Sequence, residues 1–163
     1  MIQQPARIGA FVEEVLRYYS PSTGVARTVI EPVEIGGVAL APGDRLLCAI
    51  NSGNRDDAPF GDGEIFDMDR RRRPHLAFGW GLHACLGQNL ARADLRIFLS
   101  EILLRMPDFE IDPDRVEPYA SVPLVSGYAA MPMQFTPSRP KAAVRDWPLL
   151  TAPRLRPVEG RGG

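Results

Sequence analysis

The sequence has 163 residues, the length of one ordinary domain or of a piece of a larger one. Its 19 Lys and Arg residues nearly balance 20 Asp and Glu residues, so no basic surface for nucleic acid is predicted. Two cysteines are too few for a disulfide scaffold, and no stretch has the roughly 20 apolar residues of a membrane-spanning helix. The first residues do not form a secretion signal, so we expect a cytoplasmic protein with neither nucleic-acid nor membrane partners.

The N-terminal elements follow from periodicity and from turn residues. Residues Pro5 to Tyr19 repeat apolar side chains at helical spacing and predict an amphipathic helix. Stretches rich in β-branched residues or bounded by turn pairs predict two strands and a hairpin, at residues 25–30, 45–50 and 33–40. Residues 51–74 form a long irregular segment, and such segments inside compact domains tend to be functional.

The longest predicted helix covers residues 86–106 and is followed by Pro107. Apolar residues occupy most of its circumference, so we expect deep burial. Cys48, in mid-strand with no His or acidic neighbour, is expected to be a buried structural thiol. Short strands are predicted near residues 109–111, 123–125 and 132–135. The structured part is expected to be residues 1–136, followed by a Pro- and Arg-rich tail, residues 137–163, that is mostly disordered.

The most informative segment is the cysteine loop, residues 78–87, which places Cys85 at the start of this helix. Unpaired N–H groups and a partial positive charge at a helix N-terminus favour thiolate over thiol. Gly79 and Gly81 permit backbone conformations that a side chain would block, and Gly87 permits the close approach of a flat ligand. The pattern indicates a loop that presents one sulfur atom to a metal.

Other interpretations of Cys85 remain open on these residues alone. A single cysteine at a helix start is often a small buried apolar residue. Cys85 and His83 also fit a nucleophilic Cys–His pair. A zinc site needs more nearby ligands than His75, His83, Cys85 and the distant Cys48 offer.

The cysteine loop is similar to the haem-binding signature of the cytochrome P450 family, Phe-x-x-Gly-x-x-x-Cys-x-Gly. Its four fixed positions are filled by Phe78, Gly81, Cys85 and Gly87, with His83 where the family usually has His or Arg. The continuation Gln-Asn-Leu-Ala-Arg after Gly87 also resembles bacterial members.

Two further matches occur in the family's order. Glu14 and Arg17 match the Glu-x-x-Arg motif, whose two residues share one helix face. By resemblance, Arg70 of the following meander, residues 54–70, joins them in a buried ionic network. An exposed Glu14–Arg17 pair, or a competing Glu13–Arg17 pair, is equally compatible with the sequence.

The resemblance implies an α+β fold class, namely the C-terminal haem-binding part of the mainly helical cytochrome P450 fold. Two main helices, a small antiparallel sheet, the meander and the cysteine loop are expected. The implied cofactor is haem b, iron protoporphyrin IX, with Cys85 as the ligand to the iron and Arg27, His75 and His83 holding its propionates. The other implied cofactor contacts are Phe78, Gly79, Gly81, Leu86, Gly87 and Ala91.

The implied activity is that of a monooxygenase, an oxidoreductase that inserts one oxygen atom of O2 into a small organic substrate. The implied electron source is a ferredoxin-type donor with its reductase. Segments found upstream in the family are not found here, including the helix whose acid–alcohol pair delivers protons. We therefore expect a truncated chain that is inactive alone, or one half of a split enzyme with a separately encoded N-terminal half. A non-catalytic haem-binding or structural remnant is the alternative.

Overall fold

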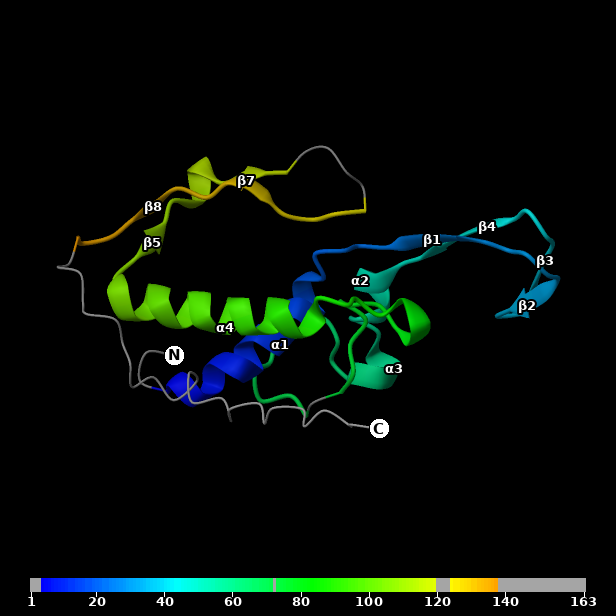
Figure 1. Cartoon of the computed structure of the whole chain (residues 1–163), viewed down its shortest axis with the longest axis horizontal. Helices are drawn as coiled ribbons and strands as arrows, with labels where there is room; N and C mark the ends of the chain where they lie inside the picture. The colour runs from blue at the N-terminus through cyan, green and yellow to red at the C-terminus, as the bar shows by residue number, and fades with distance from the viewer. Residues whose placement is uncertain (1–3, 72, 120–123, 138–163) are drawn as a thin grey trace, which may run out of the picture.

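The computed structural model describes residues 4–71, 73–119 and 124–137. Its helices, in chain order, are the 3-10 turn η1 (Pro5–Arg7), α1 (Ile8–Tyr19), α2 (Ile50–Gly53), α3 (Asp57–Phe60), η2 (Gly81–His83), α4 (Gln88–Arg105) and η3 (Pro113–Arg115). Its strands are β1 (Val25–Thr28), β2 (Val33–Ile35), β3 (Val38–Leu40), β4 (Arg45–Cys48), β5 (Glu110–Ile111), β6 (Glu117–Pro118), β7 (Tyr128–Ala130) and β8 (Met133–Gln134). Figure 1 shows α1 beside α4, with the β1–β4 ribbon leading away to the β2–β3 hairpin.

Helix α1 carries the core of the molecule on one face. Ile8, Val12 and Leu16 recur every four residues and are buried, because residues at this spacing share one helix face. Against them pack partly buried side chains of α4, of the first residue of the cysteine loop and of the residue before it: Ala77, Phe78, Leu95, Leu99 and Leu103. The helix ends at Tyr19. The N–H of Ser20 still bonds the carbonyl of Leu16, and the left-handed backbone of Ser20 then ends the helix. The predicted helix is confirmed, with its first three residues in the 3-10 turn η1.

The strands form four separate antiparallel pairs rather than the one small sheet that was predicted. β1 pairs with β4, and β2 with β3 across the Gly36-Gly37 turn, where both glycines have positive φ. β5 pairs with β8, and β6 pairs with β7. Of the strand predicted near residues 123–125, residue 123 lies outside the described residues, and Val125 forms an isolated bridge with Ser22. The expectation that residues 51–74 are wholly irregular is corrected by the short helices α2 and α3.

Cys48 is exposed, so its predicted burial is wrong. It lies at the end of β4, opposite Val25 of β1. The β1–β4 pair is a two-stranded ribbon whose residues are mostly exposed, so a side chain on it gains no cover from a second layer. The sequence pattern of a buried strand was present, but the covering layer is not found in the described residues.

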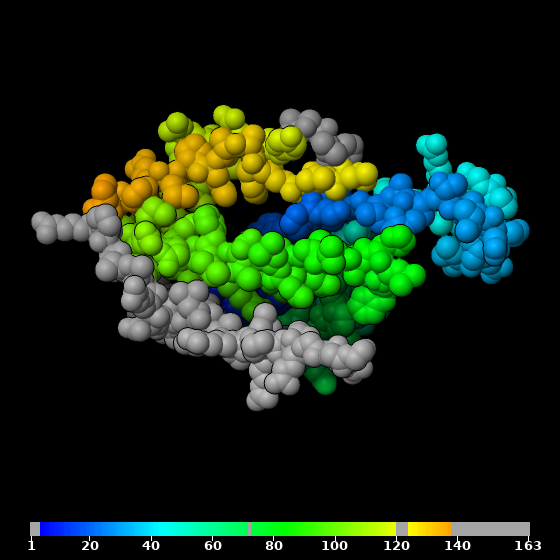
Figure 2. Space-filling model, viewed as in Figure 1, coloured from blue at the N-terminus to red at the C-terminus, as the bar shows by residue number. Residues whose placement is uncertain are grey.

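Helix α4 was also predicted to be deeply buried, and this is wrong for the described chain. The helix exists as predicted, yet Ser100 is its one buried residue, while Leu90 and Phe98 are 66% and 61% exposed. Only the face that carries Leu95, Leu99 and Leu103 packs against α1. Figure 2 shows an open space between α4 and the C-terminal strands.

The outer face of α4 therefore exposes several large apolar side chains, Leu90, Ile97 and Phe98, that the described residues do not cover. None of the described helices combines the length and apolar character that crossing a membrane requires.

The tail prediction for residues 137–163 falls, from residue 138 onward, outside the described residues.

Replacement of Leu90 and Phe98 by Gln should lower the binding of a hydrophobic dye to the isolated chain, because these side chains contribute to an exposed apolar patch. Dye fluorescence and helical circular dichroism should be measured together, and the helical signal should persist. Leu16→Gln is the matched control, since Leu16 is buried in the core and its loss should reduce the helical signal. A wild-type chain that is monomeric and binds no dye would contradict this prediction.

Candidate functional site

A buried ionic network joins α1 to the meander. Arg17 and Glu14 form a two-point pair, with Nη2 2.6 Å from Oε1 and Nε 2.9 Å from Oε2. Arg70 Nε lies 3.5 Å from Glu14 Oε1, and the backbone N–H of Asp67 donates to the same oxygen at 2.9 Å. The structure thus brings the three predicted residues together. It excludes the exposed Glu14–Arg17 alternative, since the two side chains are only 6% and 3% exposed.

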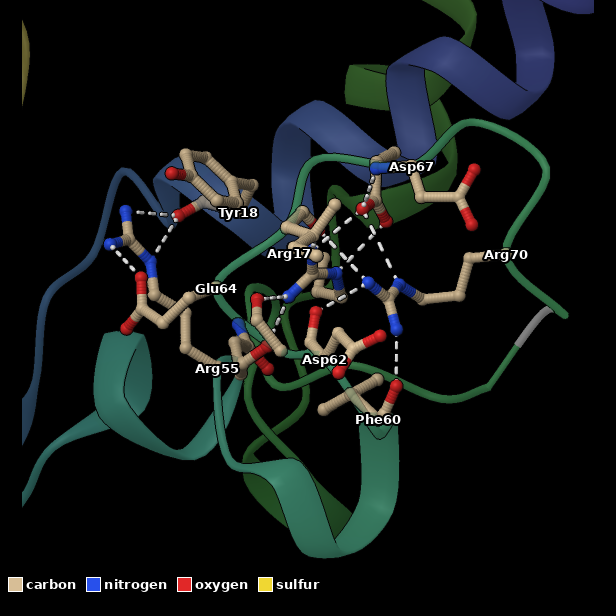
Figure 3. Close-up of polar contacts among 12 residues, drawn as sticks. Arg17, Tyr18, Arg55, Phe60, Asp62, Glu64, Asp67 and Arg70 are labelled. Atoms are coloured by element: carbon tan, nitrogen blue, oxygen red, sulfur yellow. Dashed lines mark hydrogen bonds and ion pairs between the residues drawn. The ribbon is translucent and has the colours of Figure 1, made fainter.

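The two arginines of this network also satisfy the backbone of the meander. Arg17 reaches the carbonyl of Asn54 at 2.7 Å, and Arg70 reaches that of Asp62 at 2.8 Å. The further accepting carbonyls are those of Phe60, Gly63 and Ile65. Figure 3 shows both guanidinium groups turned toward this backbone. Because the segment has little secondary structure of its own, side-chain donors replace the ladder bonds that its carbonyls lack.

The carboxyl of Glu14 stays ionised inside this network. Burial alone would raise its pKa, but hydrogen bonds from Arg17 and the Asp67 amide, with the charges of Arg17 and Arg70, hold the pKa below 4.5. A buried carboxylate among guanidinium groups is therefore a fixed anion.

Asn54 links the meander to the cysteine loop, and sequence reasoning missed this role. Its side chain is fully buried, donates to Ser20 Oγ at 2.8 Å and accepts from the Leu76 amide at 2.6 Å. Leu76 in turn accepts from the N–H of Gly79, at 2.8 Å, at the start of the loop. The C-terminal end of α1, the meander and the cysteine loop are thus one hydrogen-bonded unit.

The cysteine loop is closed by backbone hydrogen bonds that leave its thiol exposed. The N–H of Cys85 donates to the carbonyl of Phe78 at 2.8 Å, and that of Ala84 to Gly81 at 3.1 Å. Gly79 and Gly81 have φ of 72° and 66°, a conformation that side chains disfavour. Cys85 itself is exposed, just before α4 begins.

The surroundings of Cys85 fit a flat apolar ligand that brings its own metal. Leu82 and Leu86, on either side of it in sequence, are fully exposed, and Leu90 is 66% exposed. A Cβ built on Gly87 would lie 3.9 Å from Cys85 Sγ, so glycine keeps the space beside the sulfur open. Among the described residues no three His, Cys, Asp or Glu side chains gather as metal ligands, which disfavours zinc. One thiol in an apolar setting is the donor set that a haem needs.

The residues predicted to hold the propionates have different settings. Arg27 is exposed on β1, and His83 is exposed in η2. His75, by contrast, has both ring nitrogens engaged: Nε2 lies 3.2 Å from Glu13 Oε2, and Nδ1 accepts from the Ala77 amide at 3.3 Å. Both ring nitrogens of His75 thus bond within the described chain, and its propionate role stays a prediction.

The other predicted contacts lie in or beside the loop. Phe78 is half-buried against the α1 core, and Ala91 stands in the first turn of α4, where its N–H donates to Gly87. The described residues show no hydrogen bond between Cys85 and His83, so the nucleophilic pair has no geometric support.

Glu13 does not pair with Arg17 but with Arg92, Arg96 and His75, a cluster that sequence spacing did not reveal.

Comparison with known proteins identifies the family of the chain. The sequence model of the family described as cytochrome P450 matches residues 8–125. The steroid C26-monooxygenase of Mycolicibacterium smegmatis is 39% identical over 132 residues, which cover 81% of this chain and 33% of the relative. The biotin biosynthesis cytochrome P450 of Bacillus subtilis is 39% identical over 109 residues, or 67% of this chain and 28% of the relative.

Solved structures agree with the sequence relatives. The crystal structure of P450BioI in complex with a fatty-acid-ligated acyl carrier protein has a TM-score of 0.78 and 35% identity, and the match covers 83% of this chain and 35% of that one. The structure of CYP109E1 from Bacillus megaterium in complex with corticosterone has a TM-score of 0.78 and 34% identity, with coverage of 82% and 36%. The α+β fold class is confirmed, and the chain spans about a third of the length of these proteins.

Removal of the Arg17 guanidinium by Arg17→Ala should lower the free energy of unfolding by about 3 to 5 kcal/mol, because Glu14 would remain as an unpaired buried anion. Denaturant unfolding measures this change. Arg7→Ala removes a mostly exposed pair with Asp69 and should cost less than about 1 kcal/mol. Equal effects of the two substitutions would show that the buried network does not support the fold.

Stability should also fall as the pH falls below about 6.5, because of His75. Burial lowers the pKa of His75 below 6.5 despite the hydrogen bond and charge of Glu13. The folded state therefore takes up this proton less readily than the unfolded state, and protons favour unfolding below that pH. The lowered pKa values of Glu13 and Glu14 add a second loss below pH 4.5.

The test is the free energy of unfolding at about pH 7.5 and 5.5. His75→Gln should flatten the dependence in this window. A wild-type protein whose stability is constant across the window would contradict the assignment to His75.

Proposed function

This chain belongs to the cytochrome P450 family, and from that premise we propose that it is the cysteine-bearing part of a haem-thiolate monooxygenase. The observation that carries the proposal is the exposed thiol of Cys85, held at the start of α4 by a loop with all four fixed residues of the family signature. The bound haem would activate dioxygen for insertion of one oxygen atom into an organic substrate.

In this proposal Cys85 is the ligand to the iron of haem b. Arg27, His75 and His83 hold the propionates. Arg27 and His83 are exposed, and His75 would exchange one of its contacts within the chain for a propionate oxygen. The proposed contacts with the macrocycle are Phe78, Gly79, Gly81, Leu86, Gly87 and Ala91. Backbone N–H groups at the start of α4 moderate the charge on the sulfur, and the exposed Leu82, Leu86 and Leu90 keep water from its surroundings once covered.

The proposed partners follow from how much of a cytochrome P450 is present. The chain spans about a third of its relatives, and the outer face of α4 is apolar and uncovered by the described residues. We therefore propose that an N-terminal portion of the same fold, joined to the chain or separately encoded, covers this face. A ferredoxin-type donor with its reductase, a small organic substrate and a cytoplasmic location remain predictions from the family resemblance.

A second candidate is a non-catalytic haem-binding or structural remnant. The same exposure of α4 favours it for the isolated chain, because a substrate pocket needs walls on both sides of a ligand. Turnover with haem, ferredoxin and reductase separates the candidates. We expect no coupled hydroxylation by the isolated chain and a gain of coupling when an N-terminal portion is supplied.

The test of the proposal is the spectrum of the reduced, carbon-monoxide-bound protein after addition of haem. The chain, with the N-terminal portion of a relative, should show the red-shifted Soret band of thiolate ligation. Cys85→Ser should abolish the band. Cys48→Ser is the matched control, because it removes the other exposed thiol and should leave the band unchanged. Persistence of the band in Cys85→Ser would reject Cys85 as the ligand.

A further inference from the structure

Glu13 is the centre of a second cluster of charges, distinct from the Glu14 network. Its carboxylate accepts from Arg92 Nε at 2.9 and 3.1 Å, lies 3.4 Å from Arg96 Nη2, and accepts from His75 at 3.2 Å. Arg92 and Arg96 stand on α4, and His75 lies just before the cysteine loop. One side chain of α1 thus contacts two segments that are about 60 and 80 residues further along the chain.

Arg92, which pairs with Glu13, also contacts the cysteine loop. Its guanidinium carbon lies 4.5 Å from the centre of the Phe78 ring, within range of a cation–π contact. The carbonyl of Phe78 accepts the hydrogen bond from Cys85 that closes the loop, at 2.8 Å. A bond from Arg92 Nη1 to Gln88, 3.1 Å long, further fixes the guanidinium on α4. A continuous path of contacts therefore leads from Glu13 through Arg92 and Phe78 to the backbone of Cys85.

The loop depends on such contacts because it is not closely packed on that side. A cavity of about 500 Å³ lies between it and α1, lined by both Glu13 and Arg92 as well as by Phe78, Gly79 and Ala84. On the other side the loop is tied to Asn54 through Leu76. Where close packing is missing, a few directed contacts decide the position of a backbone segment.

We propose that Glu13 is a positioning residue for Cys85 and that it acts on the cysteine loop through Arg92. The role rests on the proposed haem-thiolate function, since Cys85 is positioned as a ligand. Glu13 holds the Arg92 guanidinium over the Phe78 ring, and this ring fixes the carbonyl that receives the Cys85 amide. Glu14, its neighbour, fixes the meander instead.

The first experiment measures amide hydrogen exchange, residue by residue, in the 163-residue chain. Glu13→Gln keeps the shape of the side chain and removes its charge. We expect it to raise the exchange rate of the Cys85 amide by about tenfold and that of the Leu16 amide, within α1, by less than about twofold. In an Arg92→Ala background, Glu13→Gln should change the Cys85 rate by less than about twofold, because the path is already broken.

Two further variants keep the result decisive. Glu101→Gln is the matched control, since it removes an exposed pair on α4 with Arg105 and should leave the Cys85 rate unchanged. Phe78→Leu retains the Glu13–Arg92 pair but removes the ring, and should raise the Cys85 rate like Glu13→Gln. Equal acceleration at Cys85 and Leu16 in Glu13→Gln, or a full effect that survives in Arg92→Ala, would overturn the proposal.

The second experiment measures, from the absorption spectrum, how much of the haem iron is ligated by thiolate. In the haem-loaded complex of the chain with an N-terminal portion, Glu13→Gln should reduce the share of haem that shows the thiolate Soret band, at unchanged haem content. An unchanged share would also overturn the positioning role. A wild-type complex without this band would reject the haem-thiolate function, and the exchange experiment would then still decide whether Glu13 controls the loop.

Discussion

The buried guanidinium of Arg17 is the interaction on which the rest of the structure depends. It neutralises Glu14 and, at the same time, donates to carbonyls of the meander that have no partner in a helix or sheet. A lysine could not replace it, because one ammonium group cannot make a two-point pair with a carboxylate and also reach several carbonyls in a plane. An irregular segment thereby gains fixed partners for its carbonyls, and Asn54 of this segment ties the cysteine loop to it through Leu76.

The sequence predicted what depends on nearby residues and failed where distant segments decide. Helix α1 and helix α4 follow from apolar periodicity and flanking prolines, and the β2–β3 hairpin follows from its glycine pair. The burial of Cys48 and of the outer face of α4 was predicted wrongly, because each depends on a covering layer absent from the described residues. A pattern of apolar residues predicts that a surface will be covered, but it does not predict which segment covers it.

The candidate site shows the same division. The signature residues of the cysteine loop are close in sequence, so Cys85 and its glycines were found without the structure. His75 was assigned to a propionate by position, and the structure adds that both its ring nitrogens bond within the chain, to Glu13 and to the Ala77 amide. The partner that explains this, Glu13, was considered only as a neighbour of Arg17. Its contact with Arg92 spans 79 residues, and no spacing rule reaches that far.

The pairing of α1 with late segments also determines when the chain can fold. The apolar face of α1 packs against residues between Ala77 and Leu103, and its buried charges are satisfied by residues between Asn54 and Arg70. A helix of 12 residues is marginal in water without such partners. During synthesis α1 therefore emerges before the described segments that pack against it, and these contacts are of high sequence separation. The described packing of α1 is complete only once α4 has been made, so α1 becomes stable later than its place in the chain suggests.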